Sequence, residues 1–256
     1  MTGRLSWALA VITTLASSAA AAEEVQATSS SDRSGLEVSV GLGFQVGAGY
    51  VYKNGLRLNQ TVGDVKLSDA ANGGIAFALD LGYRINRNWF VGAFGQYTHV
   101  LTKNNPLSCP DGFDCSTGQI RLGPQVQYHF SPDSSFDPFV GLGFGIVLLN
   151  STIEGEQPIP NAGGLAVGID IDSKTRGPEY VNLTVGGKWR LSDAFSFGPY
   201  LNATYARYTV RAGTITTTYP QGLPVVGGTS TTANLGPVDD GPYGLLILGV
   251  RGTYNM

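Results

Sequence analysis

The sequence contains few charged residues, few cysteines and histidines, and no long apolar run after its first residues. Charged residues make up 14% of the 256 residues, and there are 2 cysteines and 2 histidines. The lack of a basic block argues against a nucleic-acid-binding surface. The lack of a run of roughly 18 apolar residues excludes a membrane-spanning helix in the mature chain. The two cysteines and two histidines do not form the pattern of a metal site, and we expect no cofactor.

Residues 1–22 have the features of a signal peptide. They combine a positive charge at Arg4, a short apolar stretch, and small residues that end in Ala-Ala-Ala. We expect export through the Sec pathway, after which residues 23–34 form a flexible periplasmic tail and residues 35–256 form one domain. The alternative is an N-terminal anchor helix, which would need a longer apolar run.

Apolar and polar residues alternate along most of the remaining chain. In the segment 75–85, the odd positions are all apolar, whereas the even positions include Asp80 and Arg84. Successive side chains of a strand point to opposite faces. An arginine that faced lipid would cost roughly 2–4 kcal/mol at the bilayer midplane. The alternation therefore predicts a membrane-spanning strand with its apolar face toward lipid and Arg84 directed inward.

Eight segments are predicted as strands of this kind: 36–50, 75–85, 89–101, 120–130, 138–149, 181–191, 195–210 and 243–256. Short links, such as 86–88 and 192–194, alternate with long links: 51–72, 102–117, 150–177 and 212–240. Outer-membrane barrels have an even number of strands, short periplasmic turns and long extracellular loops. The sequence therefore predicts an all-β fold, a single eight-stranded antiparallel up-and-down transmembrane β-barrel in the outer membrane. Strand-like patterns within the last two long links indicate either barrel extension or a vestibule or partner-binding surface.

Aromatic residues near predicted strand ends fit the interfacial girdles of a membrane barrel, since their amphipathic rings suit the headgroup zone. The main candidates are Tyr83, Trp89, Tyr128, Trp189 and Tyr254. The two cysteines, Cys109 and Cys115, have no histidine between them, so a local disulfide is favoured over a metal site in an exported protein. Closing so small a loop stabilises it by about 2 kcal/mol in the chain-entropy model.

The interior of an eight-stranded barrel is just wide enough for side chains to fill. The charged residues predicted to lie inside are Glu37, Asp80, Arg84, Arg121, Lys188, Arg190 and Arg251. We expect an ion cluster in which Arg84 and Arg251 flank Glu37, with a structural role favoured over conduction because buried charges must be paired. Inward glycines such as Gly41 and Gly141 are expected to leave room, and any small aqueous path would favour anions.

The last strand resembles the C-terminal signature of outer-membrane proteins. Leu246, Leu248, Val250 and Tyr254 match its alternating pattern, and Met256 replaces the usual terminal aromatic residue. With the eight-strand plan, the mature chain resembles the small OmpA-, OmpX- and OmpW-type barrels, including opacity-like surface proteins. The resemblance implies insertion by the barrel assembly machinery and contact with outer-membrane lipid and lipopolysaccharide. It also implies roles that range from membrane integrity and adhesion to passage of small hydrophobic molecules.

We therefore expect a structural or surface-interaction protein that could meet an extracellular partner through its loops. The alternative is a narrow channel for small or hydrophobic solutes. The sequence His129-Phe130-Ser131 resembles the His-x-Ser of outer-membrane lipid A deacylases, but its predicted position at the periplasmic end is wrong for work in the outer leaflet. We accordingly expect no enzyme.

Overall fold

The computed structural model describes residues 34–56, 62–104, 108–159, 165–220, 230–235 and 239–256. The predicted signal peptide, residues 1–22, and residues 23–33 of the predicted tail lie outside these ranges. Among the described residues, no helix is long and apolar enough to cross a membrane.

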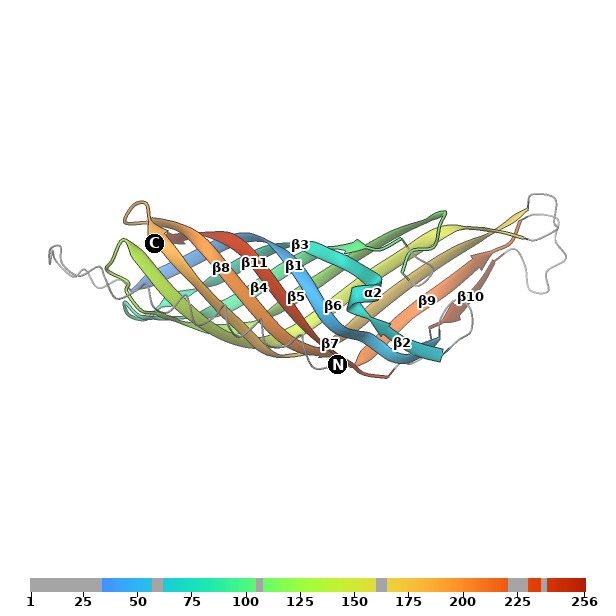
Figure 1. Cartoon of the computed structure of the whole chain (residues 1–256), viewed down its shortest axis with the longest axis horizontal. Helices are drawn as coiled ribbons and strands as arrows, with labels where there is room; N and C mark the ends of the chain where they lie inside the picture. The colour runs from blue at the N-terminus through green and yellow to red at the C-terminus, as the bar shows by residue number, and fades with distance from the viewer. Residues whose placement is uncertain (1–33, 57–61, 105–107, 160–164, 221–229, 236–238) are drawn as a thin grey trace, which may run out of the picture. The chain divides into compact units, whose positions relative to one another are not determined.

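Eight antiparallel strands form a closed ring, as the alternation predicted. The ring runs β1–β3–β4–β5–β6–β7–β8–β11, and β11 pairs with β1 to close it (Figure 1). Its strands are β1 (Gly35–Leu56), β3 (Ala71–Arg84), β4 (Trp89–Thr102), β5 (Phe113–His129), β6 (Phe136–Pro158), β7 (Ala166–Arg190), β8 (Phe195–Tyr208) and β11 (Gly241–Asn255). A closed ring pairs the backbone N–H and C=O groups between strands, which a bilayer requires because it offers no water to satisfy them.

Each strand of the ring turns an apolar face outward, and its other face, which carries the polar and charged residues together with some large apolar ones, points inward. In β3, Leu81 is 51% exposed whereas Arg84 is only 7% exposed. The last strand behaves in the same way, with Leu248 exposed and its neighbour Ile247 buried. The predicted facing of the strands is therefore correct, and the apolar outer surface is the one that meets lipid.

One end of the ring, here called the turn end, carries the short links. Asn86 closes the β3–β4 turn, because its side-chain oxygen accepts hydrogen bonds from the backbone N–H groups of Asn88 and Trp89, both at 2.9 Å. Ser192 closes the β7–β8 turn by accepting from the N–H of Phe195 at 3.0 Å. Short turns of outer-membrane barrels face the periplasm, so the opposite end, the loop end, faces the cell exterior.

At the loop end the strands are longer than predicted. β6 and β7 stay paired up to Pro158 and Ala166, so most of the predicted 150–177 loop is a hairpin. β9 (Val210–Thr218) continues along β7, and β10 (Ser230–Asn234) pairs with β9. β2 (Val62–Lys66) folds back onto β1 and leads into the short helix α2 (Leu67–Ala70).

The five predicted girdle aromatics gather near the turn end. Four of them, Tyr83, Trp89, Trp189 and Tyr254, are about half exposed on the outer surface. Tyr128 is half-buried because its ring packs between Trp89 and Phe130, with ring centres at 5.0 and 5.1 Å. Rings of this kind suit the boundary between lipid tails and headgroups.

Candidate functional site

Glu37 lies in the lumen near the turn end and holds two cations. Its Oε2 is 2.6 Å from Nη2 of Arg84, and its Oε1 accepts a hydrogen bond from Nζ of Lys188 at 2.5 Å. All three side chains are nearly completely buried. The sequence predicted Arg84 and Arg251 beside Glu37. The second part of this prediction is wrong, because Lys188 from β7 on the far wall takes the place assigned to Arg251.

His129 extends this cluster toward the β5–β6 turn. Its Nε2 lies 3.3 Å from Nη2 of Arg84, and its Nδ1 lies 2.7 Å from Oδ2 of Asp137. An arginine can only donate, so Nε2 of His129 must accept and Nδ1 must carry the proton that is donated to Asp137. This arrangement holds the imidazole in one tautomer and uses both of its nitrogens.

Arg251 pairs with Asp80 in an adjoining group closer to the middle of the lumen. Its Nη2 lies 2.6 Å from Oδ2 of Asp80. The guanidinium also lies over two buried rings, 5.2 Å from the centre of Phe139 and 5.0 Å from that of Tyr200. Desolvated contacts of a cation with an aromatic face stabilise the charge, so Arg251 is held without Glu37.

The seven predicted lumen residues therefore do not form one cluster. Arg190 lies half-buried at the turn end, where its guanidinium donates to the backbone carbonyl of Pro132. Arg121 belongs to a third group nearer the loop end, whose acidic partner is Glu179. The alternation of odd and even positions assigned these side chains to the inner face. It does not tell which of the eight strands lie opposite one another across the lumen.

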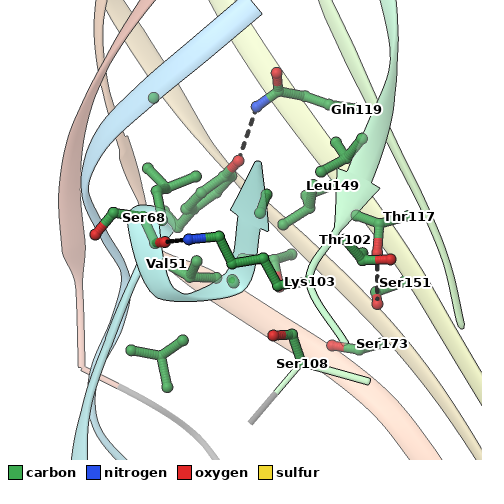
Figure 2. A pocket seen from close by; sticks show the side chains of 18 of the residues that line it. Val51, Ser68, Thr102, Lys103, Ser108, Thr117, Gln119, Leu149, Ser151 and Ser173 are labelled. Carbon is green, nitrogen blue, oxygen red and sulfur yellow. Dashed lines mark hydrogen bonds between the residues drawn. The ribbon is translucent and has the colours of Figure 1, made fainter. Parts of the chain in front are cut away.

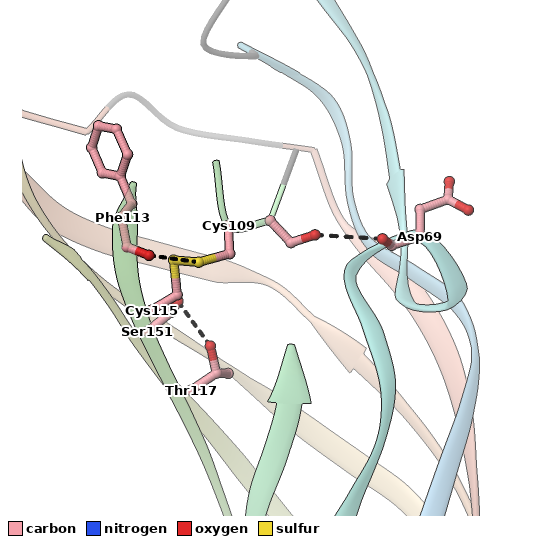
Figure 3. The surroundings of a disulfide bond; sticks show 7 residues. Asp69, Cys109, Phe113, Cys115, Thr117 and Ser151 are labelled. Carbon is pink, nitrogen blue, oxygen red and sulfur yellow. Dashed lines mark hydrogen bonds between the residues drawn. A yellow bond between two sulfur atoms is a disulfide. The ribbon is translucent and has the colours of Figure 1, made fainter. Parts of the chain in front are cut away.

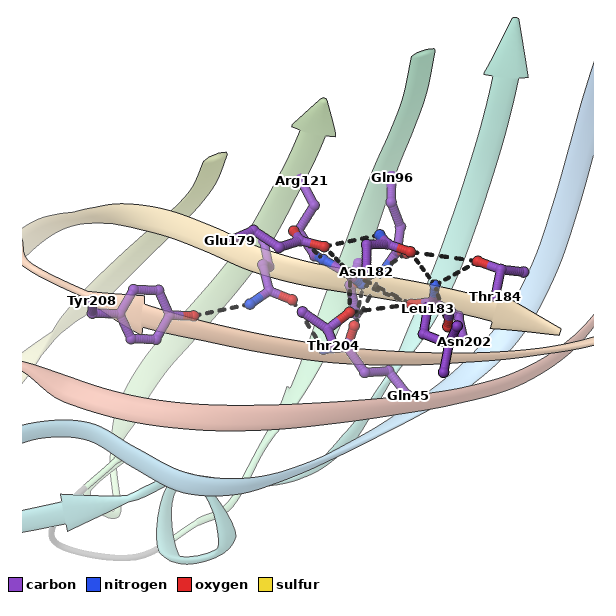
Figure 4. A network of polar contacts seen from close by, with 12 residues as sticks. Gln45, Gln96, Arg121, Glu179, Asn182, Leu183, Thr184, Asn202, Thr204 and Tyr208 are labelled. Carbon is purple, nitrogen blue, oxygen red and sulfur yellow. Dashed lines mark hydrogen bonds and ion pairs between the residues drawn. The ribbon is translucent and has the colours of Figure 1, made fainter. Parts of the chain in front are cut away.

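Arg121 and Glu179 form the centre of a polar network that spans the lumen (Figure 4). Two arginine nitrogens donate to the two carboxylate oxygens of Glu179, at 2.9 and 2.5 Å. Arg121 also donates to Gln96 at 3.0 Å and to Thr204. Further hydrogen bonds join side chains from β1, β4, β5, β7 and β8, namely Gln45, Gln96, Thr98, Gln119, Asn182, Thr184, Asn202 and Tyr208. We call this set the lumen network.

Sequence reasoning missed Glu179 because the alternation of β7 is interrupted beside it. Glu179 has the same parity as Val181, which faces outward and is 41% exposed, yet Glu179 is only 1% exposed. The register against both neighbouring strands shifts at this point. A β-bulge inserts an extra residue and so reverses the facing of the residues beyond it. The available signal was Arg121, an inward charge that needed an acidic partner.

The room expected beside the inward glycines is occupied by large side chains. A Cβ placed on Gly41 would lie 3.2 Å from the ring of Tyr200, and one on Gly143 would lie 3.1 Å from the ring of Phe94. A Cβ on Gly141 would lie 3.1 Å from Gln127. These glycines therefore let bulky neighbours fill most of the lumen, and a cavity of only about 20 Å³ remains beside Tyr200, Asn202 and Arg251.

Above the lumen network lies a small apolar floor. Tyr208 and Tyr243 stack with ring centres 4.4 Å apart, and they pack with Val147, Ala206 and Leu245. The hydroxyl of Tyr208 accepts a hydrogen bond from Gln119 at 2.9 Å, which ties the floor to the network. The same alternation that places Asn202 inward also places Tyr208 inward, so this residue could have been predicted.

A pocket of about 360 Å³ opens above this floor (Figure 2). Its volume lies at the small end of the range of about 300–1,000 Å³ for small-molecule sites. Leu67 of α2 and Leu149 of β6 pack against the floor, and both line the pocket. Serine and threonine side chains alternate with the apolar ones on the walls, so the site offers a mainly apolar cavity with scattered polar groups.

The predicted disulfide between Cys109 and Cys115 is present, and it lies next in sequence to the pocket-lining Ser108 (Figure 3). It anchors the start of β5 beside Ser108, a pocket-lining residue whose hydroxyl donates to the carbonyl of Asp69 in α2 at 3.4 Å. The next inward residue of β5, Thr117, contacts Ser151 of β6 at 3.0 Å. The disulfide therefore fixes the connection that carries Ser108 to the start of β5, while the barrel itself is closed by strand pairing.

No group of three or more potential metal ligands occurs within the described part of the chain. The arrangement as a whole is that of an outer-membrane barrel with a side-chain-filled lumen and a pocket at its extracellular end. The sequence matches the outer membrane protein beta-barrel domain family over residues 8–219. The chain belongs to this family.

Several solved structures are similar to this chain. The outer membrane protein AlkL, solved in lipid bilayers, is 14% identical, with 92% of this chain and 97% of AlkL covered and a TM-score of 0.43. OprG from Pseudomonas aeruginosa is 15% identical, with 88% and 98% covered and a TM-score of 0.43. A major outer membrane protein from Thermus thermophilus is 13% identical, with 86% and 99% covered and a TM-score of 0.47. No curated protein sequence matches the chain.

Proposed function

We propose that this protein acts at the cell surface by binding a small, mainly apolar molecule in the pocket at its loop end. The observation that supports this most directly is the pocket of about 360 Å³ above the stacked Tyr208 and Tyr243. Burying apolar ligand surface against such residues contributes roughly 25 cal/mol per Å². The role is thus one of surface interaction, and contacts with lipopolysaccharide or an extracellular partner are proposals of the same kind.

The lumen network favours binding over transport. A solute leaving the pocket toward the periplasm would have to separate Arg121 from Glu179, both of which are fully buried. Breaking a buried ion pair is costly, since each charge would be left without its partner. The group around Arg251, Phe139 and Tyr200 lies further along the same path. These obstacles support a closed barrel over the alternative of a narrow channel.

The surroundings of His129 support a non-enzymatic role. A histidine that activated Ser131 would need a free ring nitrogen within hydrogen-bond reach of the serine hydroxyl. Both nitrogens of His129 are already engaged, one by Arg84 and one by Asp137. Asp137 also accepts from the backbone N–H of Ser131 at 3.3 Å. We interpret this group as a structural element that secures the turn end.

Binding can be tested with 1-octanol as a neutral probe. The full chain would be placed in lipid nanodiscs with methyl-labelled leucine and isoleucine, and 1-octanol would be titrated in. We expect saturable methyl shifts at Leu67, Leu149 and Leu245, because these residues line the pocket. The substitution Ser151→Phe should fill the pocket and abolish the shifts.

The matched control is Thr152→Phe. Thr152 is adjacent to Ser151 in β6 but is not among the pocket-lining residues, and its hydroxyl donates to Asp172 on the other face of the strand. This variant should bind 1-octanol like the unaltered protein. Shifts that never saturate, or that survive unchanged in Ser151→Phe, would show that the probe reports the lipid and would contradict the proposal.

A further inference from the structure

The pocket is lined by two basic side chains, Lys103 and Arg211, and by no acidic one among the described residues. We propose that its ligand is a small amphiphile with one anionic head group and a short apolar body. This inference rests on the proposed binding function and names the class of ligand.

Lys103 lies at the end of β4, where the chain leaves the barrel wall. Its Nζ donates to the backbone carbonyl of Ser68 in α2 at 2.7 Å, and its own backbone N–H donates to Ala70 at 2.9 Å. Figure 2 shows the side chain extended toward α2 along the pocket. An ammonium group has three donors, so one contact with a carbonyl leaves it able to bind an anion.

Arg211 occupies the β9 wall of the pocket. Its Nε donates to the hydroxyl of Ser173 at 3.2 Å, and its guanidinium lies 5.1 Å from the ring centre of Tyr52. Ser173 and Tyr52 both line the pocket as well. These neutral contacts orient the guanidinium and do not neutralise its charge. Its fork of donors matches the geometry of a carboxylate or phosphate.

Around the pocket, the acidic residues of the extended β6–β7 hairpin lie on the face turned away from the cavity. Glu154 follows the pocket-lining Ile153, and Asp170 and Asp172 flank the pocket-lining Ile171; all three acids are exposed. No described carboxylate lies within 4.0 Å of the charged nitrogens of Lys103 or Arg211. The loop segments outside the described residues contain no Asp or Glu in their sequence. The strand alternation therefore leaves the pocket with a net positive charge.

An apolar body would contact the remaining walls and the floor. Leu67, Leu149 and Leu245 lie at the floor, and Ile153 and Ile171 lie on the extended hairpin. A purely apolar ligand would leave the two cations without an anionic partner, and an inorganic anion would leave the apolar walls unfilled. An amphiphile satisfies both parts of the site at once.

The test compares three eight-carbon probes that differ in head group: octanoate, 1-octanol and octylammonium. Each would be titrated into the full chain in neutral nanodiscs at about pH 7.5, with the leucine and isoleucine methyl shifts as the readout. We expect octanoate to bind about tenfold more tightly than 1-octanol, as one charge-assisted hydrogen bond allows. Octylammonium should bind most weakly, and added salt should reduce the preference for octanoate.

Lys103→Met and Arg211→Met should each weaken octanoate binding more than 1-octanol binding, so that the ratio of the two affinities falls toward one. The matched control is Lys174→Met, because Lys174 is exposed and is not a pocket-lining residue. Equal affinities for the three probes would overturn the inference but leave the proposed binding function intact. Failure of 1-octanol and octanoate alike to bind would overturn the proposed function itself.

Discussion

At the scale of single residues, the lumen shows how charges are accommodated inside a membrane barrel. Three of its described ion pairs join strands that are not neighbours in the ring, such as Arg121 of β5 with Glu179 of β7. A buried charge without a partner costs several kcal/mol. These pairs therefore hold separate walls together, and their removal should weaken the barrel more than the loss of a surface pair.

Replacing Glu37 with glutamine tests whether the buried ion pairs stabilise the barrel, because Glu37 pairs with two cations. The change leaves Arg84 and Lys188 buried without a carboxylate, and we expect a loss of about 3–5 kcal/mol. The measurement is the temperature at which the compact folded band converts to the unfolded band on a heat-modifiability gel. That temperature should fall clearly.

The control is Asp133→Asn, which removes a surface ion pair. Asp133 lies 3.0 Å from Arg87, but the two side chains are 57% and 34% exposed. Exposed pairs contribute about 0–1 kcal/mol, so the band conversion should hardly move. Equal shifts for both variants would show that Glu37 does not hold a buried cluster.

At the scale of elements, the loop end is built from continued strands and one cross-linked connection. The β6–β7 hairpin extends the wall beyond the ring, and the bulge beside Glu179 sets which of its residues face the pocket. The link between β4 and β5 contributes Ser108 to the pocket lining, and the disulfide begins at the next residue, Cys109. The hairpin extension and the cross-linked connection shape the pocket, and both lie beyond the part of the wall where the eight strands close the ring.

Removing the disulfide with the double substitution Cys109→Ser and Cys115→Ser should therefore have a local effect. A cross-link worth about 2 kcal/mol corresponds to roughly thirtyfold more frequent opening of its loop. We expect hydrogen exchange to accelerate by about that factor at Phe113, whose N–H is bonded to Pro110 at 3.1 Å. Exchange in β4 should stay as it was. Acceleration throughout the barrel would show instead that the disulfide supports the whole fold.

At the scale of the whole barrel, different interactions close the ring and fill the lumen. Backbone pairing closes the wall. Side chains from several strands then fill the interior in successive groups: Glu37 with its cations, Arg251 with its rings, the lumen network, and the tyrosine floor. An interior of eight strands has little space beyond its side chains, which is why the pocket lies above these groups.

The filled interior predicts that the reconstituted protein will show no steady ionic conductance in planar bilayers. The double variant Arg121→Ala and Glu179→Ala should remain closed as well, because the group of Arg251, Phe139 and Tyr200 blocks the path below it. Single-channel recording checks both, with a gel to show that each protein is folded. Stable conductance steps from the unaltered protein would favour the narrow channel.

The sequence by itself determined the eight membrane-spanning segments, their facing within the membrane and their order in the ring. Alternation is a local property of the sequence. Because an arginine in lipid is costly, the face that carries Arg84 must point into the lumen and the face that carries Leu81 must point toward lipid. The lengths of the links then orient the barrel. The girdle positions of Trp89 and Trp189 follow from the same local reasoning.

Only the tertiary structure decided which inward residues meet. Partner choice across a lumen depends on the stagger of strands and on bulges, so Glu37 contacts Lys188, Arg251 contacts Asp80, and Glu179 turns inward against its parity. The pocket has the same origin, because Lys103 and Arg211 are 108 positions apart in the sequence and become neighbours of one cavity only when the ring closes. Local periodicity specifies which face of a strand a residue occupies, whereas a site forms only when the inward faces of several strands are brought together in space.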